Sequence, residues 1–182
     1  KIPTVGGAAV RIAAISGQAI QVRGASWGRD GFIYLAPNVS HPISRIPVDG
    51  GAAEEVTKLD DARDERTHRF PQVLPNGKAV LYTSDTTAST EFYDDARIEA
   101  VELSTGERRV LVEGSSQARC CSGGRLIFAR GGALFALPFD SETLAVTGSP
   151  EPVVQQVATD VSSGGVQFAL SHSGAALWVP GG

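Results

Sequence analysis

The sequence repeats with a period of 44 to 50 residues, which limits the chain to a few repeat architectures. One stretch recurs 44 positions further on with its apolar, proline and glycine pattern retained, at 1–9 and again at 45–53. Glycines that follow a turn residue and precede an apolar run recur at intervals of 46, 47 and 50 residues: Gly31, Gly77, Gly124 and Gly174. Periods of this length are typical of propellers and solenoids.

Each repeat predicts four short antiparallel strands. Asp-Gly and Asn-Gly pairs favour tight hairpin turns, and an apolar residue stands just before each turn: Trp27, Val73, Cys120 and Leu170. A third strand is expected at 97–103, where apolar and polar residues alternate, and a fourth at 108–112. Residues 54–66 have some helical character. The repeat, however, predicts an outer strand followed by a charged loop at this place. These units predict an all-β fold, a β-propeller of four-stranded antiparallel blades.

The 182 residues are interpreted as a single propeller domain or a fragment of one, with about four blade equivalents. Blades are expected at about 22–66, 67–114 and 115–158, with one further blade split between 1–21 and 159–182. The two split parts are expected to join within the chain, which we favour, or to pair between copies, giving a homodimer through exposed blade edges. Since the chain has no Met, we expect a fragment or a processed chain.

Composition narrows the classes of partner. The net charge is −4 and no block of Lys or Arg is present, so nucleic acid is not an expected partner. No run of eighteen apolar residues occurs, so no membrane segment is expected. Cys120 and Cys121 are adjacent and are the only thiols, which excludes a disulfide framework and a Cys-x-x-Cys zinc site. Two thiols in a buried strand are the expected arrangement.

No catalytic or metal-binding set is predicted. Residues 24–28 match the Gly-x-Ser-x-Gly pattern, but they lead into another strand, whereas a nucleophile elbow needs a helix. His41, His68 and His172 lack the spacing of metal ligands. Two acidic clusters lack the ligand order of a calcium loop and are expected to be solvated: Asp60, Asp61, Asp64 and Glu65; Glu91, Asp94 and Asp95. We therefore expect no catalytic residue, no metal and no cofactor.

Six stretches, in this order and spacing, resemble the TolB-like, WD-repeat-like propeller, most closely the one that follows the kinase domain in bacterial serine/threonine protein kinases: 24–30, 68–77, 106–111, 117–119, 134–140 and 167–171. The resemblance implies a propeller that binds a protein, peptide or small ligand as the sensor or scaffold of a larger bacterial protein. It also favours a periplasmic or other extracytoplasmic location. It supplies no catalytic residue, and kinase motifs are absent from the sequence.

Residues near the inner strands are the candidate ligand-binding set, since these strands surround the channel of a propeller: Trp27, His68, Arg69, Arg119 and Gln167. Arg69 and Arg119 would donate hydrogen bonds to an anionic group such as a peptide carboxylate, while His68 is expected to bond the backbone between blades. The sequence thus favours a non-catalytic binding module, not an enzyme. The alternative is a propeller hydrolase or lactonase with a metal at the channel mouth.

Overall fold

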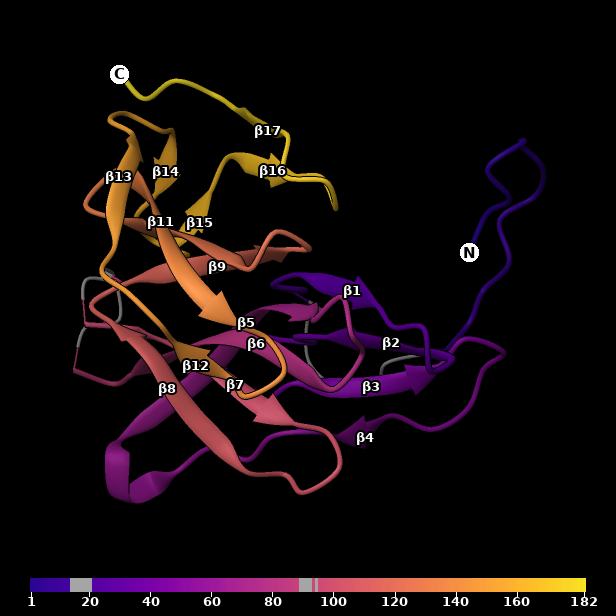
Figure 1. Cartoon of the computed structure of the whole chain (residues 1–182). Helices are drawn as coiled ribbons and strands as arrows, with labels where there is room; N and C mark the ends of the chain where they lie inside the picture. Colours follow the sequence, from indigo (N-terminus) through magenta and orange to yellow (C-terminus); the bar gives the residue numbers. More distant parts are fainter. Residues whose placement is uncertain (14–20, 89–92, 94) are drawn as a thin grey trace.

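The computed structural model describes residues 1–13, 21–88, 93 and 95–182, and it is built almost entirely of β-strands (Figure 1). Within this part of the chain the single helix is a 3₁₀ turn, η1 (Asp61–Arg63). The side chain of Asp60 caps η1 by accepting a hydrogen bond from the Ala62 N–H at 3.0 Å. The segment at 54–66 is therefore a short outer strand followed by a capped turn.

The first sheet contains four antiparallel strands in sequence order: β1 (Ala25–Trp27), β2 (Phe32–Leu35), β3 (Ser44–Pro47) and β4 (Glu54–Glu55). The second sheet also has its strands in sequence order, and it contains the longest described strand, β5. Its strands are β5 (Glu65–Val73), β6 (Ala79–Thr86), β7 (Arg97–Glu102) and β8 (Arg108–Glu113). The strands predicted at 97–103 and 108–112 are β7 and β8, which supports the reading of the repeat.

The third sheet departs from the simple pattern at its outer edge. Its strands are β9 (Ser116–Cys121), β10 (Arg125–Arg130), β11 (Ala133–Asp140), β12 (Ala145–Val146) and β13 (Glu151–Val154). Both β12 and β13 pair with β11, at its end and its beginning respectively, so two short pieces share the place of a fourth strand. Two small ladders follow: β14 (Thr159–Asp160) with β15 (Gly165–Val166), and β16 (Phe168–Leu170) with β17 (Ala176–Trp178).

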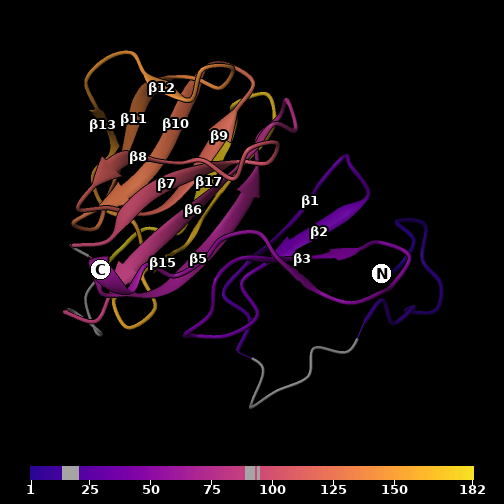
Figure 2. The same cartoon turned by 90° about the horizontal axis from the view of Figure 1, so that it is seen from below.

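The core lies between successive sheets, which are packed face against face (Figure 2). Side chains alternate along β6, so that Val80 and Tyr82 join a cluster with the first sheet while Leu81 joins a cluster with the third. In the first cluster Val80 and Tyr82 meet Tyr34 and Ile43, which are also fully buried. A strand that is buried on both faces needs the near-continuous apolar run at 79–82 that the sequence provides.

The inner strands share an irregularity at one position. Three residues before the apolar residue that precedes each turn, the backbone is left-handed, with φ of 103° at Gly24, 53° at Phe70 and 41° at Gln117. The strand pairing shifts at the same place in β5, between Arg69 and Gln72. A bulge of this kind redirects the side chains that follow it. The left-handed residue recurs in all three sheets, and a shift in strand pairing accompanies it in β5 and β9.

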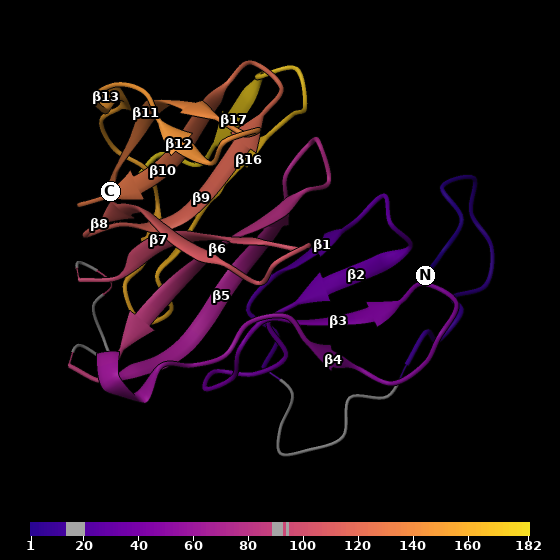
Figure 3. The ribbon, with the colours of Figure 1, turned by 60° about the horizontal axis from the view of Figure 1, so that its bottom comes forward.

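The two end segments lie apart. Residues 1–13, which belong to the expected split blade, contain no regular strand, and the side-chain ammonium of Lys1 contacts Asp49 at 3.0 Å beside the first sheet. Of the strands near the other end, β15 and β16 lie against β9, at the other side of the molecule (Figures 1 and 3). The favoured joining of 1–21 with 159–182 is therefore not formed among the residues that the structure describes, because three sheets separate the segments.

Candidate functional site

The ends of four inner strands, with three of the turns that follow them, surround one cavity of about 210 Å³. The residues that line it come from the ends of β1, β5, β9 and β16 and from the turns beyond them: Trp27, Arg29, Gln72, Val73, Leu74, Pro75, Cys120, Leu170, Ser171 and His172. All four apolar positions that the sequence repeat marked as equivalent are in this set. We call this space the mouth cavity.

Trp27 gives the mouth cavity an accessible aromatic wall. Its side chain is 59% exposed, whereas Val73 and Leu170 at equivalent positions are half-buried and Cys120 is buried. A large exposed aromatic beside apolar side chains is typical of a binding surface, because its burial by a partner is strongly favourable. Trp27 is thus the one predicted site residue that the structure places at the mouth cavity.

Basic side chains stand at the rim. Arg29 and His172 line the mouth cavity and also an adjoining cavity of about 360 Å³ beside the turn at Asp140 and Ser141. Among the described residues the Arg29 side chain has no hydrogen-bond or ion-pair partner. The Lys78 ammonium, by contrast, is bonded to the Glu142 carboxylate nearby. Arg29 therefore offers its guanidinium donors to solvent or to a ligand.

Below the rim, the Gln72 side chain holds the wall of the mouth cavity. It hydrogen-bonds to the backbone of Cys120 as a neighbouring strand would. Gln72 Nε2 donates to the Cys120 carbonyl at 2.9 Å, and Gln72 Oε1 accepts from the Cys120 N–H at 2.6 Å. Burial raises the pKa of the Cys120 thiol to about 12, so this thiol stays protonated at neutral pH. Cys120 therefore contributes an apolar surface to the cavity and not a thiolate.

Arg119 lies one residue before Cys120, on β9. Its Nη1 donates to the carbonyls of Phe70 and Ala118, both at 3.0 Å, and it has no carboxylate within 4.0 Å in the described part of the chain. Burial lowers its pKa, because no acid compensates the loss of water around the charge. A half-buried cation of this kind favours an anionic neighbour.

Arg69 is placed differently, away from the mouth cavity. It is only 2% exposed, and its three types of nitrogen are all engaged: Nε with Thr67 Oγ1, Nη1 with the Ser163 carbonyl and Nη2 with the Val39 carbonyl, at 3.2, 3.0 and 3.3 Å. Its guanidinium also lies 5.0 Å from the centre of the Tyr93 ring. Burial lowers its pKa. Arg69 therefore ties the loops of the first sheet to the segment before β15.

His68 and Gln167 do not line the mouth cavity either. The His68 ring is fully buried, and its Nε2–H donates to Glu65 Oε2 at 3.1 Å while Nδ1 accepts from the Thr57 hydroxyl at 2.8 Å. Its backbone N–H donates to the His41 carbonyl at 3.1 Å, which links the second sheet to the first. Gln167 is exposed, and among the described residues it hydrogen-bonds only through its backbone, with Ala158 and Val179.

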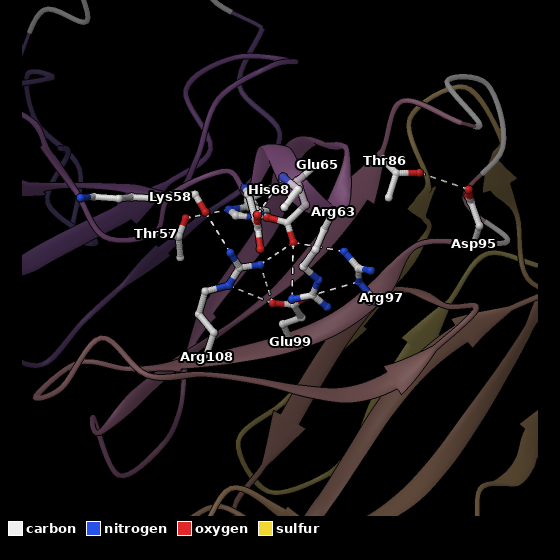
Figure 4. A network of polar contacts seen from close by, with 12 residues as sticks. Thr57, Lys58, Arg63, Glu65, His68, Thr86, Asp95, Arg97, Glu99 and Arg108 are labelled. Carbon is white, nitrogen blue, oxygen red and sulfur yellow. Dashed lines mark hydrogen bonds and ion pairs between the residues drawn. The ribbon is translucent and has the colours of Figure 1, made fainter.

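The polar network around His68 was not foreseen from the sequence (Figure 4). Two fully buried carboxylates, Glu65 and Glu99, share three arginines: Arg108 bridges them at 2.6 and 2.7 Å, while Arg97 and Arg63 approach both within 4.0 Å. Burial alone would raise the pKa of Glu65, but hydrogen bonds from His68 and Arg108 outweigh burial and hold it below its usual range.

Glu65 was expected in a solvated acidic loop, and this expectation is wrong because Arg108 on β8 and Arg97 on β7 compensate its burial. In the other acidic cluster, Glu91 and Asp94 lie outside the described residues, and Asp95 contacts Thr86. Across the described ranges, no three His, Cys, Asp or Glu side chains are grouped so that they could hold a metal ion. Nor does any described helix have the length and apolar character needed to cross a membrane.

No protein-family profile matches this sequence, and no curated protein matches it. Several solved structures are similar to this chain. TolB from Acinetobacter baumannii superposes with a TM-score of 0.59 at 20% identity, over 85% of this chain and 36% of TolB. An oligogalacturonate lyase in complex with manganese gives 0.54 at 16% identity, over 76% and 37%. A chain of the nidogen–laminin complex gives 0.56 at 16% identity, over 89% and 57%.

This chain has a β-propeller fold. The all-β structure, its successive four-stranded antiparallel sheets and the structural neighbours together confirm the fold class predicted from the repeat. The chain spans only 36% to 57% of the length of these similar proteins. At this level of identity the similarity establishes the fold alone. The TolB-like part of the resemblance is thereby supported, while the link to protein kinases stays a prediction.

The similar structures correct one expectation. The sequence favours a binding module that is not an enzyme, but one propeller that superposes on this chain is a lyase. Propellers therefore serve as scaffolds for catalysis as well as for binding, and the fold gives no ground for excluding an enzyme. Function has to be argued from the mouth cavity itself.

Proposed function

We propose that this propeller segment binds a ligand at the mouth cavity, and that the ligand presents an apolar group next to an anionic one. The observation that carries the proposal is the convergence of four repeat-equivalent residues on one space, with Arg29 at its rim, whose side chain has no partner in the described part of the chain. An apolar group would pack against Trp27 and Leu170. A carboxylate would accept hydrogen bonds from the Arg29 guanidinium.

The size of the mouth cavity indicates what kind of ligand fits. At about 210 Å³ it is smaller than the roughly 300–1,000 Å³ of pockets that enclose whole small molecules. It has room for one side chain of a larger partner. The ligand best matched to this space is the carboxyl-terminal residue of a peptide or protein, which carries an apolar side chain and a carboxylate on the same residue.

The proposal includes the wider role suggested by the sequence, a sensor or scaffold within a larger bacterial protein outside the cytoplasm. The nidogen–laminin structure supports it to the extent that a propeller chain there takes part in a protein complex. Arg119 and Arg69 stay outside the proposed site, because neither lines the mouth cavity and both donate to backbone carbonyls.

A peptide-binding measurement tests the proposal. Peptides ending in Leu or Phe, each as the free acid and as the amide, are titrated while tryptophan fluorescence is followed. We expect the free acids to bind more tightly, Trp27→Ala to abolish binding, and Arg29→Gln to remove the preference for the acid. Trp178→Phe is the matched control, because Trp178 is also exposed but does not line the mouth cavity. Equal affinity in all four proteins, or binding by none, would overturn the proposal.

A further inference from the structure

A second cavity, of about 340 Å³, lies at the other end of β9 from the mouth cavity. Its walls are Tyr93 and parts of three segments: 114–116, 129–132 and 159–164. We call this space the far cavity. Ser116 at the beginning of β9 lines the far cavity, and Cys120 near its end lines the mouth cavity. At about 3.3 Å per residue, these two residues are roughly 13 Å apart. In the described part of the chain the two cavities share no lining residue, so the far cavity is a separate space.

Arg130 lines the far cavity with a guanidinium that is held in place but not neutralised. Its Nε donates to the Gly114 carbonyl at 3.0 Å, and its Nη2 donates to the Glu113 carbonyl at 2.7 Å. The guanidinium also lies 5.3 and 5.8 Å from the ring centres of Phe128 and Phe135. Among the described residues, no carboxylate lies within 4.0 Å of it and its Nη1 has no hydrogen-bond partner. A cation that is already oriented loses little freedom on binding an anion, which favours binding.

The Ser116 hydroxyl is a second polar group in the far cavity. Ser116 is only 7% exposed, and its Oγ has no hydrogen-bond partner within the described ranges. This oxygen is nevertheless not fully buried, so a molecule in the far cavity can reach it. The neighbouring Ser115 differs, because its Oγ already donates to the Glu113 carbonyl at 3.2 Å. A nearly buried hydroxyl without a partner favours a ligand that supplies one.

Apolar groups and open space make up much of the remaining wall. Val161 is 56% exposed, and Ala129 adds a methyl group. A Cβ at Gly131 or Gly132 would meet no atom within 4 Å, so the turn between β10 and β11 leaves room beside it. At about 340 Å³ the far cavity is at the lower end of the roughly 300–1,000 Å³ of pockets that enclose a whole small molecule. A sugar would leave many hydroxyl groups against carbon here, whereas a flat apolar ring would not.

We propose that the far cavity binds a small aromatic carboxylate that also carries a hydroxyl group. The carboxylate accepts a hydrogen bond from Arg130 Nη1, where the charge of the guanidinium is not yet compensated. The ring packs against Val161 and Ala129, and the hydroxyl of the ligand bonds with Ser116 Oγ. This site takes a whole small molecule, whereas the mouth cavity has room for one residue of a larger partner. The proposal does not depend on a ligand at the mouth cavity.

Isothermal titration calorimetry on the full 182-residue chain tests the proposal with three ligands of similar size. The probe is 4-hydroxybenzoate; 4-hydroxybenzamide lacks its charge, and benzoate lacks its hydroxyl group. We expect 4-hydroxybenzoate to bind at one site per chain. The amide should bind about 10-fold or more weakly, because it loses a hydrogen bond between charged groups. Benzoate should bind about 2- to 10-fold more weakly, because it loses a hydrogen bond to a neutral hydroxyl.

Three variants assign the binding to the far cavity. Ser116→Ala should weaken 4-hydroxybenzoate but not benzoate, and it should fold normally because the Ser116 hydroxyl has no partner among the described residues. Arg130→Gln should weaken 4-hydroxybenzoate to the level of the amide. Arg125→Gln is the matched control, because Arg125 is exposed on the same strand but does not line the far cavity.

The ligand series and Ser116→Ala decide the outcome even if Arg130→Gln fails to fold, because both leave the bonds of Arg130 to the Glu113 and Gly114 carbonyls intact. No binding of 4-hydroxybenzoate to the unmodified chain, or equal affinity for the three ligands, would overturn the proposal. Unchanged affinity of Ser116→Ala for 4-hydroxybenzoate, or an equal loss in Arg125→Gln and Arg130→Gln, would overturn it as well.

Discussion

The side-chain amide of Gln72 forms a two-bond ladder with the backbone of Cys120, at 2.9 and 2.6 Å. Gln117 repeats this arrangement one sheet further along, with the Val166 carbonyl and N–H at 2.9 and 2.6 Å. A primary amide has the same donor and acceptor geometry as a peptide group, so it can take the place of a strand neighbour. Glutamines therefore connect inner strands that are too far apart to pair directly.

The Gln72 ladder predicts a specific loss of stability. Gln72→Ala leaves the Cys120 N–H without its acceptor in a buried strand, so we expect the free energy of unfolding to fall by about 1–3 kcal/mol. Urea denaturation followed by fluorescence measures this change. Gln155→Ala is the control, because Gln155 is exposed and should change stability by less than about 0.5 kcal/mol. Equal effects of the two substitutions would contradict the role given to the ladder.

The positions of the strands could be predicted from the sequence because the residues that mark them are close together in the chain. The turn glycines and the apolar residues before them, such as Trp27 and Val73, recur at positions that the chain itself displays. The side-chain directions were not predictable in this way. The left-handed residue at Phe70 shifts the pairing of β5, and this shift depends on contacts with the first sheet, since the Phe70 N–H donates to the Arg23 carbonyl at 2.7 Å.

The burial of the Glu65 carboxylate was the second feature that could not be predicted from the sequence. Glu65 belongs to an acidic stretch that is typical of a solvated loop, yet its partner Arg108 is on a strand 43 residues away. Nothing local distinguishes this carboxylate from those of Asp60 or Asp61. For the mouth cavity, by contrast, the repeat alignment already grouped Trp27 with Leu170, although it could not show that they share one space.

The buried His68 ring predicts that stability falls on acidification. Burial lowers the pKa of His68 below its ordinary value of 6.5, so the unfolded chain takes up a proton at higher pH than the folded one. Stability is then fully present above about pH 6.5 and decreases as the pH falls below that value. Urea denaturation at pH 7.5 and 5.5 should show this loss, by at most about 1.4 kcal/mol per pH unit for one group.

Two variants distinguish the contribution of His68 to the pH dependence of stability from that of His172. His68→Gln should be less stable than the unmodified protein at pH 7.5, because it removes the buried ring that lies 4.7 Å from the Tyr82 ring, but it should lose less stability between pH 7.5 and 5.5. His172→Gln should retain the full dependence, since His172 is exposed. If His68→Gln loses as much stability as the unmodified protein over this range, the buried neutral ring is not the cause.

Gly164 has to be a glycine for two reasons that can be measured separately. Its φ is 69°, and a Cβ there would come within 2.4 Å of Cγ of the Tyr93 ring. Gly131 has a similar φ of 54°, but a Cβ would meet no atom within 4 Å. Gly164→Ala should therefore be less stable than Gly131→Ala by roughly 1–3 kcal/mol, the usual cost of overpacking. Thermal unfolding of both variants gives the difference, and equal losses would show that the backbone conformation alone decides.

The adjacent thiols provide the last prediction. Cys120 and Cys121 are only 4% and 8% exposed, so a reagent has little access to either sulfur, and burial also raises the pKa of Cys120 to about 12, which keeps that thiol protonated. At pH 8 we expect a thiol reagent to label neither residue in the folded chain and both residues in urea. Gln72→Ala weakens the strand that carries Cys120, so labelling of that variant should accelerate in proportion to the local opening of β9. Rapid labelling of the folded, unmodified chain would mean that the wall of the mouth cavity opens without unfolding, and the rate would measure how often it does so.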